Sequence, residues 1–492
     1  MAKKDRNKVE NTAGPDIPGN GEAVIKGDTK VKLDSHIKFD RLDLMILLII
    51  IVISLGLRIY GLDYPKAVYF DEVHYVPAAN DFLKDGAVDR NDIHPPLAKM
   101  IIAFFIKIYG DYPLGWRAGS VVFGLLMIVC VYLLALAMFK NRFAPIMASS
   151  LLAIDFLHIV QSRIATLDIY IAAFILFGYY FIYMYYDQPP VLSKENERVR
   201  PVKYLILSAV FLGCAVAVKI SAIAGVGGAF LYALFMHIRE NRKHLLKSAG
   251  YMIQMIALFT AVLLGVFVLS HVPVFVRMAG QLKKQYAEDP QRAKQKPYIS
   301  ELMSQYKDRI TYKRTFKFHY TEKFTHPYLS QMWQWPIVHR PIWYEWTKDP
   351  VTGMLHGIVA IGSLLFWWSF IPVLLDMIYR GFKDKDNRVV FILCGYLPLY
   401  LFWLSSFSSY QGWHFKGGFF YYMMPCVPFM ALGLTETLND LRDNKIGVTS
   451  IVIYCVGLVA FLGFFYPILT GIPIPQHYFD YLMKLNIFKN WI

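Results

Sequence analysis

The sequence has few charged residues, few cysteines and no nucleotide-binding loop. Charged residues make up only 18% of the 492 positions, which is low for a water-soluble protein of several domains. The five cysteines lie in apolar runs, are odd in number and show no CxxC spacing, so the sequence predicts neither a disulfide framework nor a zinc site. No GxxxxGK[ST] element occurs, which excludes a P-loop.

Apolar residues and basic charge are in excess instead. Hydrophobic residues make up 56% of the chain and the mean hydropathy is +0.38, values that favour a membrane protein. Lys and Arg total 51 against 36 Asp and Glu. Cytoplasmic loops explain such an excess without nucleic acid, and we predict no nucleic-acid binding. The polar head of about 40 residues has no apolar core, so we expect no cleavable signal peptide.

Long apolar runs predict an all-α integral membrane protein of about eleven transmembrane helices, because roughly 20 apolar residues cross the hydrocarbon. The third predicted span contains Asp155, and little more than Lys219 separates the fifth from the sixth. The predicted spans are 43–60, 116–139, 143–161, 166–186, 203–218, 220–238, 248–272, 353–378, 389–408, 415–435 and 446–468.

Basic residues at every second junction predict the orientation, since Lys and Arg gather on cytoplasmic loops. The N-terminus is then cytoplasmic and the outer segments are 61–115 and 273–352; the latter is basic, but loops beyond about 60 residues translocate regardless of charge. The expected regions are a polar cytoplasmic tail 1–42, an N-terminal transmembrane catalytic region 43–272 that includes the first outer loop 61–115, a large outer loop 273–352, a four-helix transmembrane region 353–468 and an outer tail 469–492.

The first outer loop is itself partly helical by pattern. Asp92 and the two prolines at 95 and 96 suit a helix start, and an apolar stripe follows from Leu97 to Ile108. About 15 residues are too few to span, so we expect amphipathic interface helices there and around 75–83. The alternative is that ordinary amphipathic helices cover the outer ends of the bundle.

Nearly all candidate chemical groups lie on the outer side. The adjacent carboxylates Asp71 and Glu72 follow the first span, where a partly dry carboxylate could act as a general base; a solvated helix end is the alternative. Asp92, His94 and Lys99 surround a predicted helix N-terminus that could receive an anion or could merely start the helix.

Two arginines and an aromatic-rich segment complete the candidates. Arg117 begins the second span, and Arg163 precedes Asp168 between the third and fourth; they suit a lipid phosphate, with snorkelling as the alternative. The large outer loop carries His326, Trp335 and Arg340 among many tryptophans and tyrosines, a composition found both in interfacial belts and in sugar sites.

Taken together, these segments resemble the protein O-mannosyltransferases, membrane glycosyltransferases of the GT-C class. The likeness lies in the ordered elements Phe70-Asp71-Glu72-Val73-His74, Asp92-Ile93-His94-Pro95-Pro96-Leu97-Ala98-Lys99, Ser162-Arg163, Leu167-Asp168, His326-Pro327-Tyr328-Leu329-Ser330, Trp333-Gln334-Trp335-Pro336 and Arg340-Pro341-Ile342-Trp343-Tyr344. It covers about 45–475. The segment 273–352 leaves no room for MIR repeats, as in the shorter bacterial type, and Phe420-Tyr421-Tyr422 lacks the family's histidine.

The resemblance implies transfer of mannose, with inversion, from a polyprenyl-phosphate-mannose donor in the membrane lipid to Ser or Thr hydroxyls of exported proteins, and possible coupling to the export machinery. It implies Asp71 as general base, assisted by Glu72. Arg117, Arg163, Lys99 and Arg340 would bind the donor phosphate, while Asp92, His94, Asp168, His326 and Trp335 would position loops and substrates.

The same resemblance implies a cell-membrane protein with its active site on the extracytoplasmic side. A divalent cation is a possible cofactor, since Asp71, Glu72 and Asp92 offer oxygen ligands, but we predict no metal site. The nearest alternative is a sibling enzyme that moves another lipid-linked sugar, such as aminoarabinose to lipid A. A transporter is a distant alternative, because its ionisable residues should lie near span centres.

Overall fold

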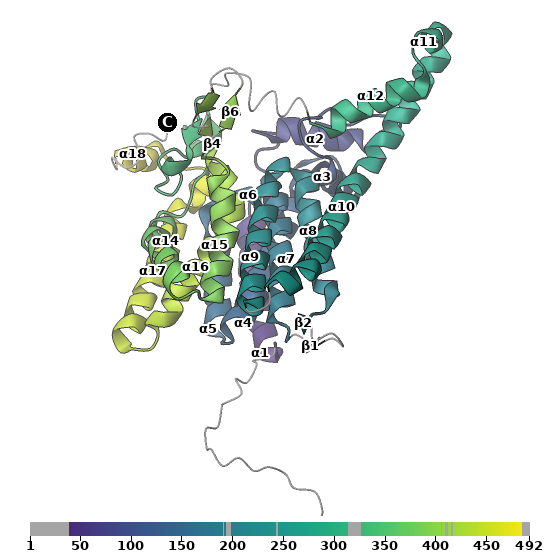
Figure 1. The fold of residues 1–492 in the computed structure, drawn as a ribbon. Helices are drawn as coiled ribbons and strands as arrows, with labels where there is room; N and C mark the ends of the chain where they lie inside the picture. The colour runs from purple at the N-terminus through teal and green to yellow at the C-terminus, as the bar shows by residue number, and fades with distance from the viewer. Residues whose placement is uncertain are drawn as a thin grey trace, which may run out of the picture. The chain divides into compact units, whose positions relative to one another are not determined.

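The computed structural model describes residues 39–189, 191–192, 198–242, 245–312, 326–404, 406–408, 412–414 and 417–484. Within them a helix overlaps each of the eleven predicted spans (Figure 1). These helices are α1 (Arg41–Ile59), α4 (Pro113–Phe139), α5 (Phe143–Ile154), α7 (Asp168–Asp187), α8 (Val202–Val218), α9 (Ile223–Asn241), α10 (Leu245–Glu288), α14 (Leu364–Lys383), α15 (Asn387–Leu401), α16 (Val427–Leu441) and α17 (Lys445–Thr470).

Length and composition identify the helices that can cross a membrane. Among the described residues, seven helical segments are long and apolar enough, namely those of α1, α4, α7, α9, α10, α14 and α17, while α5, α8 and α15 are apolar but shorter. The chain is therefore a multi-pass membrane protein, and the prediction of an all-α integral membrane fold is confirmed.

The third predicted span is two helices rather than one. It breaks at Asp155 into α5 and α6 (Phe156–Gln161). The Asp155 carboxylate accepts the backbone N–H of His158 at 3.0 Å and the indole N–H of Trp367 at 2.8 Å. A buried charge needs such partners, and here it caps the second half-helix.

The first outer loop contains the two expected helices, α2 (Glu72–Asp81) and α3 (Leu97–Tyr109). α3 packs against both α2 and α4. Ala98, Ile102 and Ile106 form its buried stripe. The spacing of four residues puts these side chains on one face, so the sequence pattern located the helix correctly.

The large outer loop is more regular than expected. α10 does not end at residue 272 but runs to Glu288 and is followed by α11 (Pro290–Gln295) and α12 (Tyr298–Ile310). Val274, Met278 and Leu282 continue the apolar stripe beyond the membrane segment and pack against Leu302 of α12. That second small core explains why the helix continues past the predicted end of the span.

Short antiparallel strand pairs connect the helices in the described residues, together with the 3-10 helices η1 (Ile220–Ala222), η2 (Met332–Gln334) and η3 (Phe420–Cys426) and the helix α18 (Gln476–Lys484). The pairs are β1 (Val191–Leu192) with β2 (Arg198–Val199), β3 (Ser330–Gln331) with β8 (Gly417–Gly418), β4 (Ile342–Lys348) with β5 (Leu355–Ala360), and β6 (Ser406–Ser408) with β7 (Gly412–His414).

The start of the eighth predicted span was wrong. Residues 355–360 form β5, which pairs with β4 from Ile342 opposite Ala360 to Lys348 opposite Leu355. The backbone hydrogen bonds of this apolar run are satisfied by a neighbouring strand, so it need not be helical. The helix α14 begins only at Leu364.

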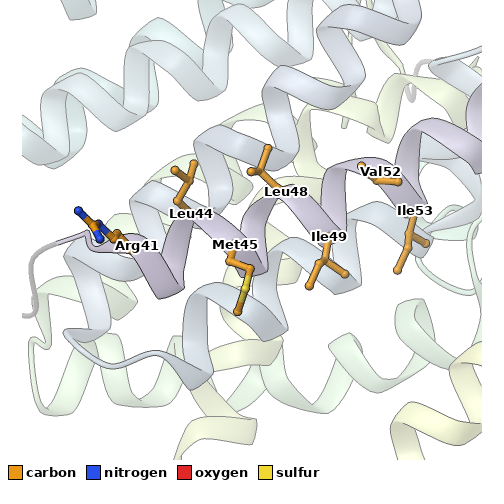
Figure 2. Close-up of a pocket in the computed structure, with 7 residues that line it drawn as sticks. All are labelled: Arg41, Leu44, Met45, Leu48, Ile49, Val52 and Ile53. Carbon is orange, nitrogen blue, oxygen red and sulfur yellow. The ribbon is translucent and has the colours of Figure 1, made fainter.

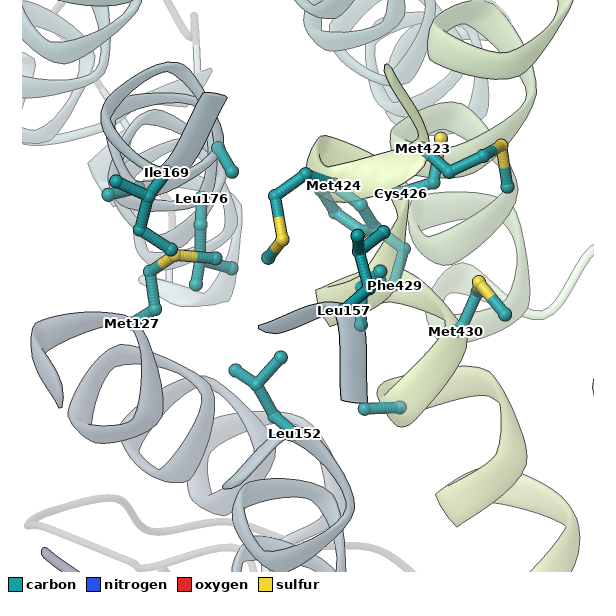
Figure 3. Packing of buried hydrophobic residues seen from close by; sticks show 14 of the residues in the cluster. Met127, Leu152, Leu157, Ile169, Leu176, Met423, Met424, Cys426, Phe429 and Met430 are labelled. Carbon is teal, nitrogen blue, oxygen red and sulfur yellow. The ribbon is translucent and has the colours of Figure 1, made fainter. Parts of the chain in front are cut away.

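The core lies where the central helices meet. Figure 3 shows Met127 of α4, Leu152 of α5 and Leu157 of α6 facing the methionines of η3 and α16. These side chains are buried, and the flexible methionines fill the irregular space beside the broken helix α5–α6. This packing fixes the ends of α4, α6 and α7, from which several candidate site residues come.

α1 contrasts with that core. Along one face it exposes apolar side chains that line a shallow groove of about 410 Å³ with Arg41 at one end (Figure 2). An apolar face of this kind on a membrane-spanning helix meets lipid tails rather than water, so its exposure carries no penalty.

Candidate functional site

Asp71 and Glu72 lie where the first outer loop turns into α2. Phe70, just before them, has a φ of +47°, a conformation rarely adopted by bulky residues. Its ring stacks on Tyr344 of β4 with 4.0 Å between ring centroids, which holds this turn. Successive residues of a helix point about 100° apart, so the two carboxylates enter separate surroundings.

The Asp71 carboxylate is half-buried and has few partners. The hydroxyl of Tyr421 donates to its Oδ2 at 3.3 Å. Burial, and after it the charge of Asp168, raise the pKa of Asp71 to about 6 against the opposing effects of Lys219 and Tyr421. A carboxylate with this pKa is ionised at neutral pH and is more basic than an ordinary aspartate, as a general base requires.

An ion pair lies beside Asp71. The Lys219 ammonium, at the break between α8 and η1, donates to the Asp168 carboxylate at the start of α7 over 3.0 Å. Its nitrogen also lies 4.3 Å from the ring centroid of Tyr422. Both charged groups are buried and line one small cavity with Tyr422 and Trp403. We call Asp71, Asp168, Lys219, Tyr421 and Tyr422 the Asp71 cluster.

Glu72 points the other way, into a closed cluster with Arg117. The guanidinium binds the carboxylate through two N–H groups at 2.9 and 3.0 Å, and the backbone N–H of Ala165 donates at 2.9 Å. Arg117 also donates to the carbonyls of Leu62 and Ala67 at 2.8 and 3.3 Å. Neither charged side chain is exposed to solvent.

This geometry favours a positioning role for Glu72 and Arg117, whose expected catalytic and phosphate-binding roles stay predictions. The Glu72 oxygens and the guanidinium N–H groups bind each other and the backbone, so neither group is arranged to touch a substrate. They tie α2 to α4 and to the loop that precedes Asp71, and therefore act as positioning residues.

Lys99 is likewise bound inside the protein. It is fully buried in α3, forms an ion pair with Asp89 and donates to the carbonyls of Asn91 and His94, the latter at 2.9 Å. These contacts use all three N–H donors of an ammonium. Burial lowers its pKa to about 8, and the Asp89 charge opposes that shift. The prediction that Lys99 binds the donor phosphate finds no support here.

Arg163 and Arg340 also donate to backbone carbonyls. Arg163 is buried and bonds the carbonyls of Arg58 and Tyr60 at 2.6 and 2.8 Å, which holds the end of α1. Arg340 donates to the carbonyl of Pro327 at 2.9 Å. In this conformation Arg163 holds the end of α1 and Arg340 holds the loop at Pro327, while their role at the donor phosphate stays a prediction.

The remaining predicted residues lie around the Asp71 cluster. The His94 ring is 6.2 Å from that of Tyr75, one turn beyond Asp71 on α2, and Asp92 lies in the same loop as His94. Trp335 is buried, donates to Ser330 at 2.9 Å and packs edge-on to Tyr422. His326 packs edge-on to Phe419, the neighbour of η3. These contacts agree with the predicted positioning roles without testing them.

Lys219, Tyr421 and Tyr422 were not predicted as site residues. Lys219 was noted only as a charge separating two apolar runs, and the tyrosines only as a departure from a familiar motif. A charge at membrane depth needs a partner, so Lys219 and Asp168 could have been paired from sequence by that rule.

The carboxylates do not gather as metal ligands. Among the described residues, no group of three or more His, Cys, Asp or Glu side chains could hold a metal ion. Of the three acids considered, Glu72 has its oxygens bound by Arg117 and Ala165. The donor set therefore does not fit the divalent cation considered from the sequence.

Comparison with known proteins identifies close parallels. Residues 48–278 match the family model PMT, described as dolichyl-phosphate-mannose-protein mannosyltransferase. The polyprenol-phosphate-mannose–protein mannosyltransferase of Mycobacterium tuberculosis is 23% identical, over 83% of this chain and 84% of that protein. The protein of the same name from Corynebacterium glutamicum is 24% identical, over 96% of this chain and 98% of that protein.

The fold has a solved counterpart. A structure of the Saccharomyces cerevisiae protein O-mannosyltransferase Pmt1–Pmt2 complex bound to the sugar donor matches with a TM-score of 0.70 at 14% identity, covering 93% of each chain. The match confirms the predicted GT-C architecture.

Proposed function

We propose that this chain is a glycosyltransferase of the PMT family that moves mannose from a polyprenyl-phosphate carrier to Ser or Thr hydroxyls of exported proteins. The observation that carries the proposal is the half-buried Asp71 with a pKa of about 6, beside a buried lysine at the outer end of the bundle. The family match suggests the type of reaction, and the Asp71 cluster provides a carboxylate that can act as its general base.

Asp71 acts as the general base. A hydroxyl is a weak nucleophile, so Asp71 accepts its proton as the hydroxyl oxygen bonds to the anomeric carbon of mannose. The bond from that carbon to the phosphate oxygen breaks in the same step, which inverts the configuration. The phosphate is a weak base and leaves with its negative charge, so the reaction needs no general acid.

Lys219 is the cation that we assign to the departing phosphate, in place of the four cations predicted from sequence. It lies within the electrostatic reach of Asp71, and among the described residues it forms its ion pair with Asp168. A fixed positive charge in a partly dry site stabilises developing negative charge more strongly than in water. Asp168 then keeps Lys219 in place before the donor binds.

The site faces the extracytoplasmic side of the cell membrane. Arg117, near the start of α4, bonds to the residue after Asp71, while Lys140 and Arg142 follow the other end of that helix. Basic residues gather on cytoplasmic loops, so Asp71 lies at the outer end and the N-terminus is cytoplasmic. Acceptor chains reach this side during export, which favours coupling to the export machinery.

The decisive experiment measures mannose transfer by the purified protein in lipid nanodiscs. Radiolabelled polyprenyl-phosphate mannose is supplied with a Ser/Thr-rich peptide and with a matched peptide in which Ala replaces every Ser and Thr. Label on the first peptide alone supports the proposal. If neither peptide is labelled while lipid A accepts aminoarabinose from its own carrier, the sibling enzyme is the correct assignment.

A further inference from the structure

The part of α10 beyond Pro273, together with α11 and α12, forms an outer arm that is clamped to the first outer loop (Figure 1). Arg277 of this arm donates to the carbonyls of Asp81, Lys84 and Ala87 at 3.1, 2.8 and 2.9 Å and to that of Phe82 at 2.7 Å. The Asp81 carbonyl ends α2, and the other three belong to the turns that follow it. One guanidinium therefore fixes the arm to the helix that begins beside Asp71.

A second clamp involves the other helix of the arm. Arg309 of α12 donates to the backbone carbonyl of Asp89 and lies 3.7 Å from its carboxylate, which also pairs with Lys99. Arg277 and Arg309 thus hold α10 and α12 against the same loop. Any groove between these three segments keeps a fixed position relative to α2.

Such a groove is present. A cleft of about 310 Å³ lies between the loop at 88–92 and the two arm helices, and its walls carry Gln281 and Gln285 of α10 and Gln305 of α12. A glutamine amide both donates and accepts, as does a peptide group, so Gln281 and Gln285 suit an extended backbone of any sequence. The Gln305 amide donates to Glu301 at 3.1 Å, and its oxygen takes no part in that contact. None of the described residues that line the cleft is aromatic, which disfavours a sugar as its occupant.

We infer that this cleft binds the extended backbone of the acceptor polypeptide at a distance from the residue that is modified; the inference rests on the proposed function. α2 has ten residues and so spans about 15 Å from Asp71 to the cleft side. An extended chain covers that distance with about five residues, at roughly 3.3 Å each. Acceptor residues about five positions from the Ser or Thr should therefore contact the cleft.

The test compares acceptor peptides of different lengths. A tripeptide with a central Thr and two longer peptides, extended by eight residues on either the N-terminal or the C-terminal side, are mannosylated by the intact protein in nanodiscs. We expect one of the extensions to raise kcat/KM about tenfold over the tripeptide, chiefly through a lower KM, since a few backbone hydrogen bonds contribute that much. In the triple variant Gln281→Ala, Gln285→Ala and Gln305→Ala, the ratio between long peptide and tripeptide should fall toward one.

Gln291→Ala is the matched control, because Gln291 is an exposed glutamine of the same arm in α11 and does not line the cleft. It should keep the full ratio. A wild-type protein without length dependence, or a triple variant that retains it, would overturn the inference while the proposed function stands. Absence of transfer to every acceptor by the wild-type protein would instead refute the proposed function.

Discussion

Asp71 and Glu72 are adjacent in the chain, but the clusters around them are built for different purposes. Glu72 has no exposed surface and accepts three hydrogen bonds, two of them from Arg117. Asp71 is half-buried, accepts one long hydrogen bond from Tyr421 and has its pKa raised to about 6 by burial. A carboxylate whose oxygens are all bound cannot accept a proton readily, whereas an under-bonded one can.

The comparison shows how a loop can be rigid and reactive at once. A buried ion pair stabilises only when its geometry and added hydrogen bonds offset the loss of hydration. The Glu72–Arg117 pair meets that condition and also binds the carbonyls of Leu62 and Ala67. The loop is thereby fixed one residue away from Asp71, whose own carboxylate is left available for chemistry.

The largest expected effect follows from a change in the Asp71 cluster. Asp71→Asn keeps the size of the side chain and removes the base, so mannose transfer should fall by about 10²- to 10⁴-fold. The thermal unfolding temperature in detergent should stay near that of the wild-type protein, because few contacts are lost. Radiolabel transfer and a melting curve on the same preparation measure both. Equal transfer by the two forms would remove Asp71 as the base.

A change in the Glu72–Arg117 pair should instead lower the stability of the protein. Glu72→Gln leaves the Arg117 charge buried without its counter-ion, which costs about 3–5 kcal/mol of stability for such pairs. We expect a clearly lower unfolding temperature, with activity lost as the protein unfolds.

The double variant Glu72→Leu with Arg117→Met removes both charges and should recover much of that stability. A Glu72→Gln protein that melts like the wild type yet transfers no mannose would restore the catalytic role that the sequence suggested.

A smaller effect concerns the pH dependence. Asp71 must be deprotonated to act as a base, so transfer should fall as the pH drops through about 6. The negative charge of Asp168 raises the pKa of Asp71 and the positive charge of Lys219 lowers it. Asp168→Asn should therefore move the acid limb of the kcat/KM profile to lower pH, and Lys219→Gln to higher pH, by roughly one unit. Shifts in the same direction for both variants would show that another group controls the limb.

The sequence predicted most of the fold because its strongest signals are local. In the described residues, a helix overlaps each apolar run that was predicted to span the membrane, and the stripe from Leu97 to Ile108 located α3. The errors came from tertiary pairing, which a single run of sequence does not reveal. The run at 355–360 is as apolar as a membrane-spanning helix, but it pairs with β4, which lies ten or so residues earlier. α10 continues beyond its predicted span because its apolar residues there pack against α12.

The candidate site was predicted unevenly for a related reason. Asp71 could be found because an acidic pair followed an apolar span and matched a familiar motif. Arg117 and Arg163 could be identified as charges but not assigned partners, since they bind acceptors from distant segments. Lys99 instead pairs with Asp89 in the loop that precedes α3. Lys219 was noted only as a charge between two apolar runs, and its partner Asp168 lies 51 positions away.

The smallest effect isolates the hydrogen bond that Asp71 accepts from Tyr421. Tyr421→Phe removes a donor at 3.3 Å, a weak bond by its length, so the pKa of Asp71 should rise slightly and transfer near pH 6 should fall by about two- to threefold. Tyr344→Phe is the matched control: its hydroxyl bonds Gln161, and its ring, which stacks on Phe70, is retained. If both variants lose activity equally, the tyrosines support the aromatic packing around Phe70 rather than the charge of Asp71. If only Tyr421→Phe shifts the acid limb, the hydrogen-bond donors of the two carboxylates have different effects. The donors to Glu72 fix the position of its side chain, whereas the donor to Asp71 adjusts its pKa.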